Sequence, residues 1–200
     1  IFPNILFGKS FFSEKFGTLT FASNTFHKNY QVNKFQTFLN NDIIWSPKGY
    51  TTKKGFVNTF ESVVKNKNYE AKNTTSYKNN RIVNELNAAV SFKSSLPMKK
   101  EGIKFSNIFT PNFMIRFSPG HMRDVSTDDI LLNYTNLYST NKTSEIERGL
   151  SSVLGFNFLV NKKDKDGSEK EKLSISMGQI FNAEKNEDMP AKSSMDQIMS

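Results

Sequence analysis

Apolar and polar side chains alternate along two neighbouring segments in the second half of the chain. In residues 150–160 the even positions are mostly apolar, and serine, glycine and asparagine fill many of the positions between them. Residues 173–181 repeat this alternation after a charged run, 162–172. A period of two is typical of a β-strand with one apolar face. The two segments therefore predict a β-hairpin whose loop, around Asp166-Gly167, is longer than a two-residue turn.

The length of the two segments matters as much as their pattern. Each keeps its alternation for about nine to eleven residues, which is the span of a tilted strand across a bilayer, whereas strands of soluble proteins cluster near five or six. One apolar face and one face of serine, asparagine and glycine also suit a barrel wall with lipid outside and water or polar cargo inside. A single hairpin would fit a soluble sheet equally well, so the interpretation depends on whether the pattern recurs.

The alternation recurs along most of the chain, with turn signals between the segments. Further strands are predicted at 16–26, 35–45, 56–64, 69–77, 82–92 and 105–117, and turns at 46–49, 66–68, 79–80 and 119–120. Residues 95–100, which contain Pro97 and a pair of lysines, are expected to leave the sheet. Residues 121–144 lack sustained alternation, as long outer loops of membrane barrels do. A short amphipathic helix over 128–137 is the alternative there, although Asn133 and Thr135 disfavour it. The chain is thus expected to be all-β, with about seven or eight antiparallel up-and-down strands.

Composition fits a thin wall better than a thick core. Hydrophobic residues make up 36% of the chain, yet phenylalanine alone occurs 19 times. Few apolar residues, concentrated in aromatics at alternating positions, suit a sheet with lipid on one side. No apolar run of about eighteen residues occurs, so a helical membrane span is not expected. The sequence begins at Ile1 without an initiator methionine or a signal peptide, and we therefore expect a fragment of a longer protein.

The formal net charge of +8 comes from 27 Lys plus Arg against 19 Asp plus Glu. Such a balance suits nucleic acid or anionic lipid headgroups, but the lysines gather at predicted turns, such as 53–54, 65–67 and 99–100, and form no helical stripe. Solvated loops account for this distribution, attraction to anionic headgroups is the alternative, and no nucleic-acid partner is expected. Because the chain has no cysteine, redox chemistry does not assign a compartment.

Motifs for catalysis or cofactor binding are missing from the sequence. The two histidines, His27 and His121, have no carboxylate or second histidine at ligand spacing. Asp164 and Asp166 faintly match a calcium loop, but Gly167 follows the second acid directly and no glutamate follows at the required spacing, which favours a hairpin turn. No Gly-x-Ser-x-Gly elbow and no phosphate-binding glycine loop occur. We therefore expect no enzyme activity, no metal and no cofactor.

Four short motifs in the second half of the chain resemble one known family. They are 116–120 (Arg-Phe-Ser-Pro-Gly), 136–139 (Asn-Leu-Tyr-Ser), 145–149 (Glu-Ile-Glu-Arg-Gly) and 178–181 (Gly-Gln-Ile-Phe). In this order and spacing they resemble the barrel of the LPS-assembly outer-membrane protein family, LptD, where LPS is lipopolysaccharide. In that family a strand ends in an aromatic-x-Pro step, a long loop carries an Asn-Leu-Phe-Ser-like element, an acid-Arg pair opens the next strand, and a Gly-Gln follows in its hairpin partner. The resemblance is densest over 113–181.

The resemblance implies a fold, a function and partners. Residues 1–200 would belong to one outer-membrane β-barrel domain of a Gram-negative cell. They would be a fragment of a large antiparallel up-and-down transmembrane barrel, with a long loop at about 119–144 and a hairpin at 145–182. The implied function is LPS transport and assembly, in which the barrel wall of the translocon inserts LPS into the outer leaflet of the cell outer membrane. The implied partners are LPS, outer-membrane lipid, a plug lipoprotein and, through an N-terminal jellyroll domain outside this sequence, periplasmic LPS-transport bridge proteins.

Alternation assigns the strand residues to the two faces of such a wall. The lumen-facing candidates are Asp42, Glu85, Asn87, Arg116 and Asn157. The lipid-facing candidates are Phe35, Leu39, Leu86, Val90, Phe113, Ile115, Leu154 and Phe156. Gln179 has the parity of its apolar neighbours, so it lies either at the headgroup level or after a bulge that switches the face. Glu145, Glu147 and Arg148 are expected to hold the long loop through ion pairs rather than to contact cargo.

Three other functions remain open at this point. A diffusion porin or receptor barrel shares every feature argued from alternation and lacks only the motif resemblance. A secreted β-sheet protein that binds a polysaccharide would dissolve without detergent. An outer-membrane hydrolase would need a serine and a histidine close in space, which His27 and His121 make improbable.

Overall fold

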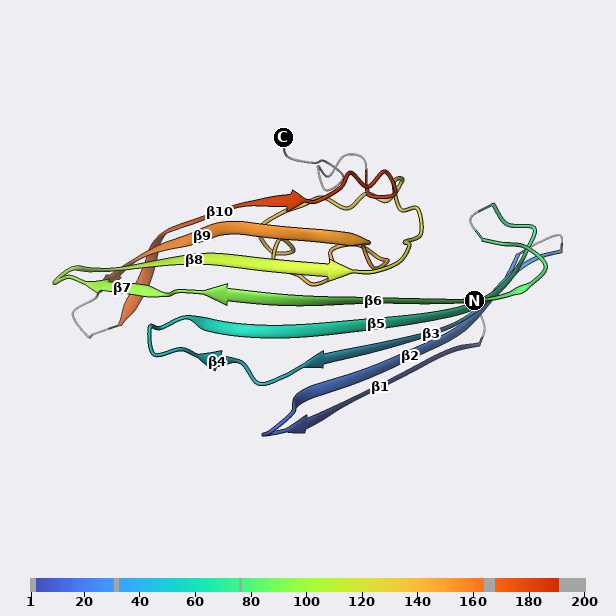
Figure 1. Cartoon of the computed structure of the whole chain (residues 1–200), viewed down its shortest axis with the longest axis horizontal. Coiled ribbons are helices and arrows are strands. Elements are labelled where there is room, and N and C mark those ends of the chain that lie inside the picture. The colour runs from blue at the N-terminus through green and yellow to red at the C-terminus, as the bar shows by residue number, and fades with distance from the viewer. Residues whose placement is uncertain (1–2, 31–32, 76, 164–167, 191–200) are drawn as a thin grey trace.

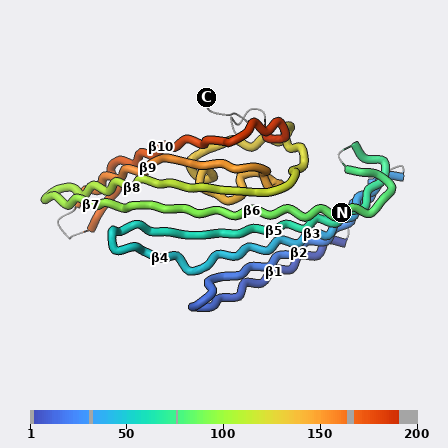
Figure 2. The backbone as a smooth tube through the Cα atoms, in the orientation of Figure 1, coloured from blue at the N-terminus to red at the C-terminus, as the bar shows by residue number. Residues whose placement is uncertain are grey.

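The computed structural model describes residues 3–30, 33–75, 77–163 and 168–190, which form one antiparallel sheet with an irregular segment folded onto it (Figure 1). The strands are β1 (Asn4–Ser13), β2 (Gly17–Tyr30), β3 (Lys34–Ser46), β4 (Tyr50–Thr51), β5 (Val57–Lys72), β6 (Ile82–Ser95), β7 (Met98–Glu101), β8 (Phe105–Ser118), β9 (Gly149–Lys163) and β10 (Glu169–Asn182). Their order is β1-β2-β3-β5-β6-β8-β9-β10, and the short strands β4 and β7 pair with β5 and β8 (Figure 2). The predicted all-β, antiparallel, up-and-down fold is confirmed.

The register divides the side chains between two faces. Phe113 of β8 lies opposite Leu154 of β9, whereas the adjacent pair Met114 and Val153 points to the other side and is 1% exposed. We call the face with Phe113 and Leu154 the outer face and the face with Met114 and Val153 the inner face. The outer face exposes large apolar side chains, among them Leu154 at 51% and Leu86 at 64%. Water-soluble monomers rarely expose a contiguous apolar surface of this kind.

Three predictions about the middle of the chain are wrong. Residues 98–101, most of which were expected to lie outside the sheet, form β7 and pair with β8. β5 runs unbroken through the predicted turn at 66–68, and the predicted strand at 69–77 is the end of β5 followed by a loop. Asparagines usually indicate a turn because their side chains bond to nearby backbone. Here their side chains bond across the sheet surface instead, since Asn66 Oδ1 accepts from Asn41 Nδ2 of β3 at 3.4 Å and Asn68 Oδ1 accepts from Asn84 Nδ2 of β6. Polar pairs of this kind stabilise neighbouring strands, so the backbone stays extended.

The register also excludes one of the two explanations for Gln179, a bulge that would switch its face. Pairing between β9 and β10 is continuous from Leu173 to Asn182, with Gln179 opposite Leu154 on the outer face. The register shift in this hairpin lies earlier, between Glu171 and Leu173. No bulge therefore turns Gln179 toward the inner face.

Residues 119–148, between β8 and β9, contain turns and bends, and the alternative helix over 128–137 does not form. In the part of the chain that the structure describes, no helix is long and apolar enough to cross a membrane. The predicted turn at Asp166-Gly167 lies outside the described residues.

Among the described residues, buried apolar side chains form four small clusters rather than one core. One joins Met114, Val153 and Ile180 of the strands to Leu137 of the segment 119–148. Others likewise combine inner-face strand residues with loop residues. The wall is therefore one sheet thick, and irregular segments supply a partial second layer on its inner face alone.

Candidate functional site

Residues 119–148, which we call the inner loop, fold back over the inner face (Figure 1). Gly120 and Gly149 bend the chain at its two ends with φ of 91° and 97°, a region that side chains other than glycine rarely adopt. Along the way, Ile146 packs against Val63 of β5 and is 1% exposed. The inner loop therefore crosses from β8 over β6 to β5 before it returns to β9.

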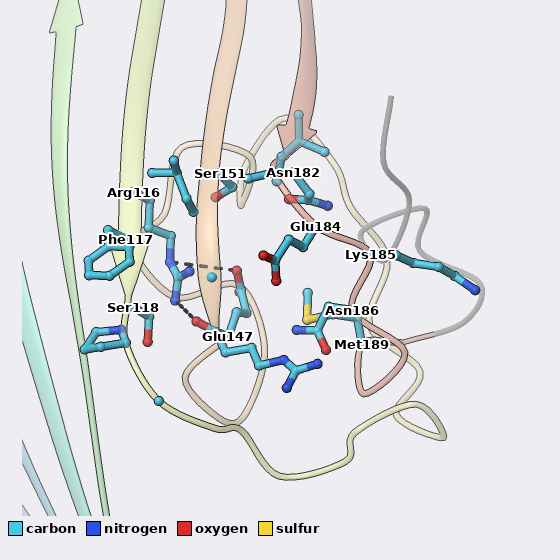
Figure 3. A pocket seen from close by; sticks show the side chains of 17 residues that line it. Arg116, Phe117, Ser118, Glu147, Ser151, Asn182, Glu184, Lys185, Asn186 and Met189 are labelled. Carbon is cyan, nitrogen blue, oxygen red and sulfur yellow. Dashed lines mark hydrogen bonds and ion pairs between the residues drawn. The ribbon is translucent and has the colours of Figure 1, made fainter. Parts of the chain in front are cut away.

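A buried ion cluster attaches the inner loop to β8 (Figure 3). Arg116 is 2% exposed and donates from Nε to the carbonyl oxygen of Thr140 and from Nη2 to that of Glu147, both at 2.5 Å. The Glu147 carboxylate lies 3.9 Å from Arg116 and 3.5 Å from Lys142 Nζ. Burial lowers the pKa of Lys142, and the charge of Glu147 opposes that shift. Because both buried cations lie near the Glu147 carboxylate, the loop can lie against the sheet without an isolated ion inside the wall.

A second anchor attaches the inner loop to β5 and β6. Arg123 Nη2 donates to both carboxylate oxygens of Glu85 at 2.7 Å, and its guanidinium lies 4.5 Å from the centre of the Tyr77 ring. Nearby, Lys67 of β5 forms an ion pair with Glu145. Burial raises the pKa of Tyr77, so this phenol remains protonated and neutral beside the cation. Charge-assisted hydrogen bonds thus hold the loop at two places on the inner face, one at β8 and one at β5 and β6.

Two glycines make room for the tip of the inner loop. Gly155 of β9 and Gly178 of β10 lie opposite each other on the inner face. A Cβ at Gly155 would collide with the Met177 carbonyl oxygen and the Tyr138 hydroxyl, and a Cβ at Gly178 would collide with Leu137. The loop side chains therefore occupy the space that strand side chains would otherwise fill. This close approach explains why the Gly-Gln motif needs its glycine.

Cavities lie beside the inner loop. One, of about 610 Å³, is bordered by the ends of β8 to β10 and the segment after β10, and Arg116, Arg148 and Glu184 are among its lining residues (Figure 3). Two others, of about 450 and 470 Å³, share Lys93 and Tyr138. One of these extends toward β3 and β5 and the other toward β9 and β10. The inner face therefore combines paired charges with open polar space.

The register places all five lumen candidates on the inner face: Asp42, Glu85, Asn87, Arg116 and Asn157. Asp42 and Asn87 share a row across the sheet with Lys65, whose Nζ lies 4.0 Å from the Asp42 carboxylate. The structure brings Glu85 and Arg116 together with the inner loop, and Asn157 lines the 470 Å³ cavity. That this face lines a lumen stays a prediction.

All eight lipid candidates lie on the outer face: Phe35, Leu39, Leu86, Val90, Phe113, Ile115, Leu154 and Phe156. Contact with lipid likewise stays a prediction.

The outer face also carries a row of hydrogen-bonded polar side chains that the sequence patterns did not reveal. Ser23 Oγ donates to Asn41 Oδ1 at 2.8 Å, Asn41 Nδ2 donates to Asn66 Oδ1 at 3.4 Å, and Asn84 Nδ2 donates to Asn68 Oδ1. These amides satisfy one another, which reduces the cost of an apolar environment.

The three loop candidates have different surroundings. Glu145 and Glu147 form the ion pairs described above, whereas Arg148 is exposed and no ion pair joins it to another described residue. Sequence analysis did not single out Lys142 or Arg123, which supply two of the partner cations. Neither carries a local signal, because their roles depend on strands that are distant in sequence.

One comparison with known proteins identifies a family. The family model described as LptD, LPS transport system D, matches residues 15–198. No curated protein matches the chain. The family match begins before β2 and continues beyond β10, so it includes the inner loop, both of its anchors and all four motifs that resembled this family. The chain therefore belongs to the LptD family of LPS transport.

Proposed function

We propose that this sheet is a section of an outer-membrane barrel that passes LPS to the outer leaflet. The observation that carries the proposal is the difference between the two faces. The outer face exposes aromatic and aliphatic side chains along β1 to β10, and the inner face carries paired charges under the inner loop. An amphiphile needs this division, because its sugars travel along a polar route while its acyl chains stay near lipid.

The strand dimensions support a position in the bilayer. β8 and β9 contain 14 and 15 residues, more than the roughly 9 to 11 that a tilted strand needs to cross the hydrocarbon. The sheet order leaves β1 and β10 at the two edges. Because hydrocarbon does not tolerate unpaired backbone groups, the proposal requires both edges to pair within a closed barrel.

Family membership supports partners for the intact protein. A lipoprotein plug would fill the lumen, and periplasmic bridge proteins would deliver LPS through the jellyroll domain. The inner loop already covers part of the inner face of β5, β6 and β8. A plug would therefore contact the inner loop and the less covered inner faces of β1 and β2.

Depletion and restoration in cells test the transport proposal. We expect depletion of the intact protein to lower the amount of newly made LPS at the cell surface, and plasmid-borne protein to restore it. Glu147→Gln, which removes the carboxylate that two buried cations share, should restore it poorly. Glu187→Gln is the matched control, because the Glu187 side chain is 84% exposed and its carboxylate lies 3.3 Å from Lys185 alone.

Two results would contradict the proposal. Unchanged surface LPS on depletion, together with rapid swelling of liposomes that contain the protein, would favour a porin. Recovery of the intact protein from water without detergent would favour a secreted sheet.

A further inference from the structure

The 470 Å³ cavity between the tip of the inner loop and strands β9 and β10 has the size of a small-ligand site. Its strand-side wall includes Asn157, Ser174 and Ser176 of the inner face. None of these three side chains makes a hydrogen bond to another described residue, in contrast to the paired groups around Arg116 and Glu85. The cavity therefore offers hydrogen-bonding groups that the fold itself does not use.

A single cation, Lys93 of β6, lines this cavity. Its Nζ lies 4.9 Å from the centre of the Tyr138 ring, and within the described part of the chain no carboxylate lies within ion-pair distance. Other inner-face cations near the loop, such as Lys67 and Arg116, are neutralised by acidic residues. Lys93 is thus held in place by a ring and keeps its charge available to a ligand.

The loop side of the cavity adds an aromatic surface. Tyr134 is 72% exposed and lines the cavity together with Thr135 and Ser139. A flat ring next to hydroxyl and amide groups fits a sugar, whose ring has an apolar face and a polar rim. The one carboxylate among the lining residues, Glu171, is exposed, and it forms no ion pair with Lys93.

We propose that this cavity binds a sugar that carries an anionic substituent, a phosphate or a carboxylate. Lys93 contacts the anion, Tyr134 covers the sugar ring, and Asn157, Ser174 and Ser176 hydrogen bond to its hydroxyls. The proposal rests on the proposed function, because it treats the saccharide part of LPS as the ligand. It adds a defined contact point on the inner wall for that saccharide.

Photo-crosslinking in the intact protein tests this site. A benzophenone amino acid at Ser176, which faces the cavity, is compared with one at Ile175, which faces outward on the same strand. Each is combined with Lys93, Lys93→Gln or Lys93→Arg, and the probes are purified LPS and the same LPS treated with phosphatase. Resistance of the unheated protein to SDS verifies that each variant is folded.

With intact LPS, we expect crosslinking at Ser176 to fall about tenfold or more in Lys93→Gln and to be retained in Lys93→Arg, because a charge-assisted hydrogen bond is lost only in the first. If phosphatase treatment abolishes the dependence on Lys93, the anion is a phosphate; if the dependence persists, it is a carboxylate. Equal crosslinking by folded Lys93 and Lys93→Gln proteins would overturn the site and leave the transport proposal intact. No LPS crosslink at Ser176 in any variant, with crosslinks at Ile175 only, would contradict both.

Discussion

Replacement of Arg116 by methionine tests whether the inner loop is held by the buried ion cluster. Methionine fills a similar apolar volume but donates no hydrogen bond. The change removes the two donations to the carbonyl oxygens of Thr140 and Glu147 and leaves the Glu147 carboxylate, 4% exposed overall, with Lys142 as its cation. The strands keep their backbone pairing, so the effect should be confined to the inner loop.

The magnitude follows from what remains buried after the change. Arg116 makes two charged hydrogen bonds to carbonyl oxygens, each worth about 1.5 to 3 kcal/mol, so the loss of both costs about 3 to 6 kcal/mol. We expect the free energy of loop opening to fall by about that amount, which corresponds to about two to four decades in the opening equilibrium. The double variant Arg116→Met with Glu147→Gln should lose more, because it leaves Lys142 buried without a carboxylate.

Hydrogen exchange followed by mass spectrometry on the detergent-solubilised intact protein measures this opening. Peptides from the inner loop should exchange faster in Arg116→Met, whereas peptides from β8 and β9 should not. Arg81→Met is the matched control, because Arg81 is exposed and should change stability by less than about 0.5 kcal/mol. Equal exchange of loop peptides in the wild type and Arg116→Met would show that the cluster does not hold the loop.

Three further predictions concern the two faces of the wall, a glycine beneath the inner loop and the end of the sheet that carries Glu101. Leu154→Arg should lower the free energy of unfolding by about 2 to 4 kcal/mol if Leu154 lies at mid-bilayer, and Asn157→Arg should lower it much less. Urea unfolding in lipid vesicles measures both, and equal penalties would contradict the face assignment. Gly155→Ala should destabilise the folded barrel by about 1 to 3 kcal/mol in the same assay, because its methyl group meets a backbone carbonyl that cannot move aside; an unchanged midpoint would refute this. At the turn end, hydrogen bonding to Lys163 lowers the pKa of Glu101 from 4.5 to about 2. The stability from this pair should be full above pH 4.5 and lost as the pH falls toward 2, and an NMR titration midpoint near 4.5 would contradict it.

The strands were predictable where alternation was strict. β8, β9 and β10 have apolar outer positions in nearly every row, and the pleat of a strand makes this pattern a purely local property. The first half of β5 was predicted, but its continuation past residue 64 was not, because its outer face contains Asn66 and Asn68, which normally indicate a turn. Only the neighbouring strands, which supply further amides in register, make the extended form favourable there.

The candidate site was predictable only in part. Parity placed Glu85 and Arg116 on one face of the sheet, as the register does, since parity needs no knowledge of distant partners. Lys93 and Tyr138 carried no such signal. Their proximity depends on the path of the inner loop across the sheet, and that path is decided by the ion pairs and by the space above Gly155 and Gly178.

The sequence by itself determined that this protein is a sheet of long antiparallel strands with one apolar and one mixed face, because side-chain alternation follows directly from strand geometry. Its ordered motifs also pointed to the LptD family. The tertiary structure alone decided that residues 119–148 lie on the inner face, which charges are paired there and which cation stays available. These features join residues such as Lys67 and Glu145, 78 positions apart, and no local pattern specifies contacts across that separation.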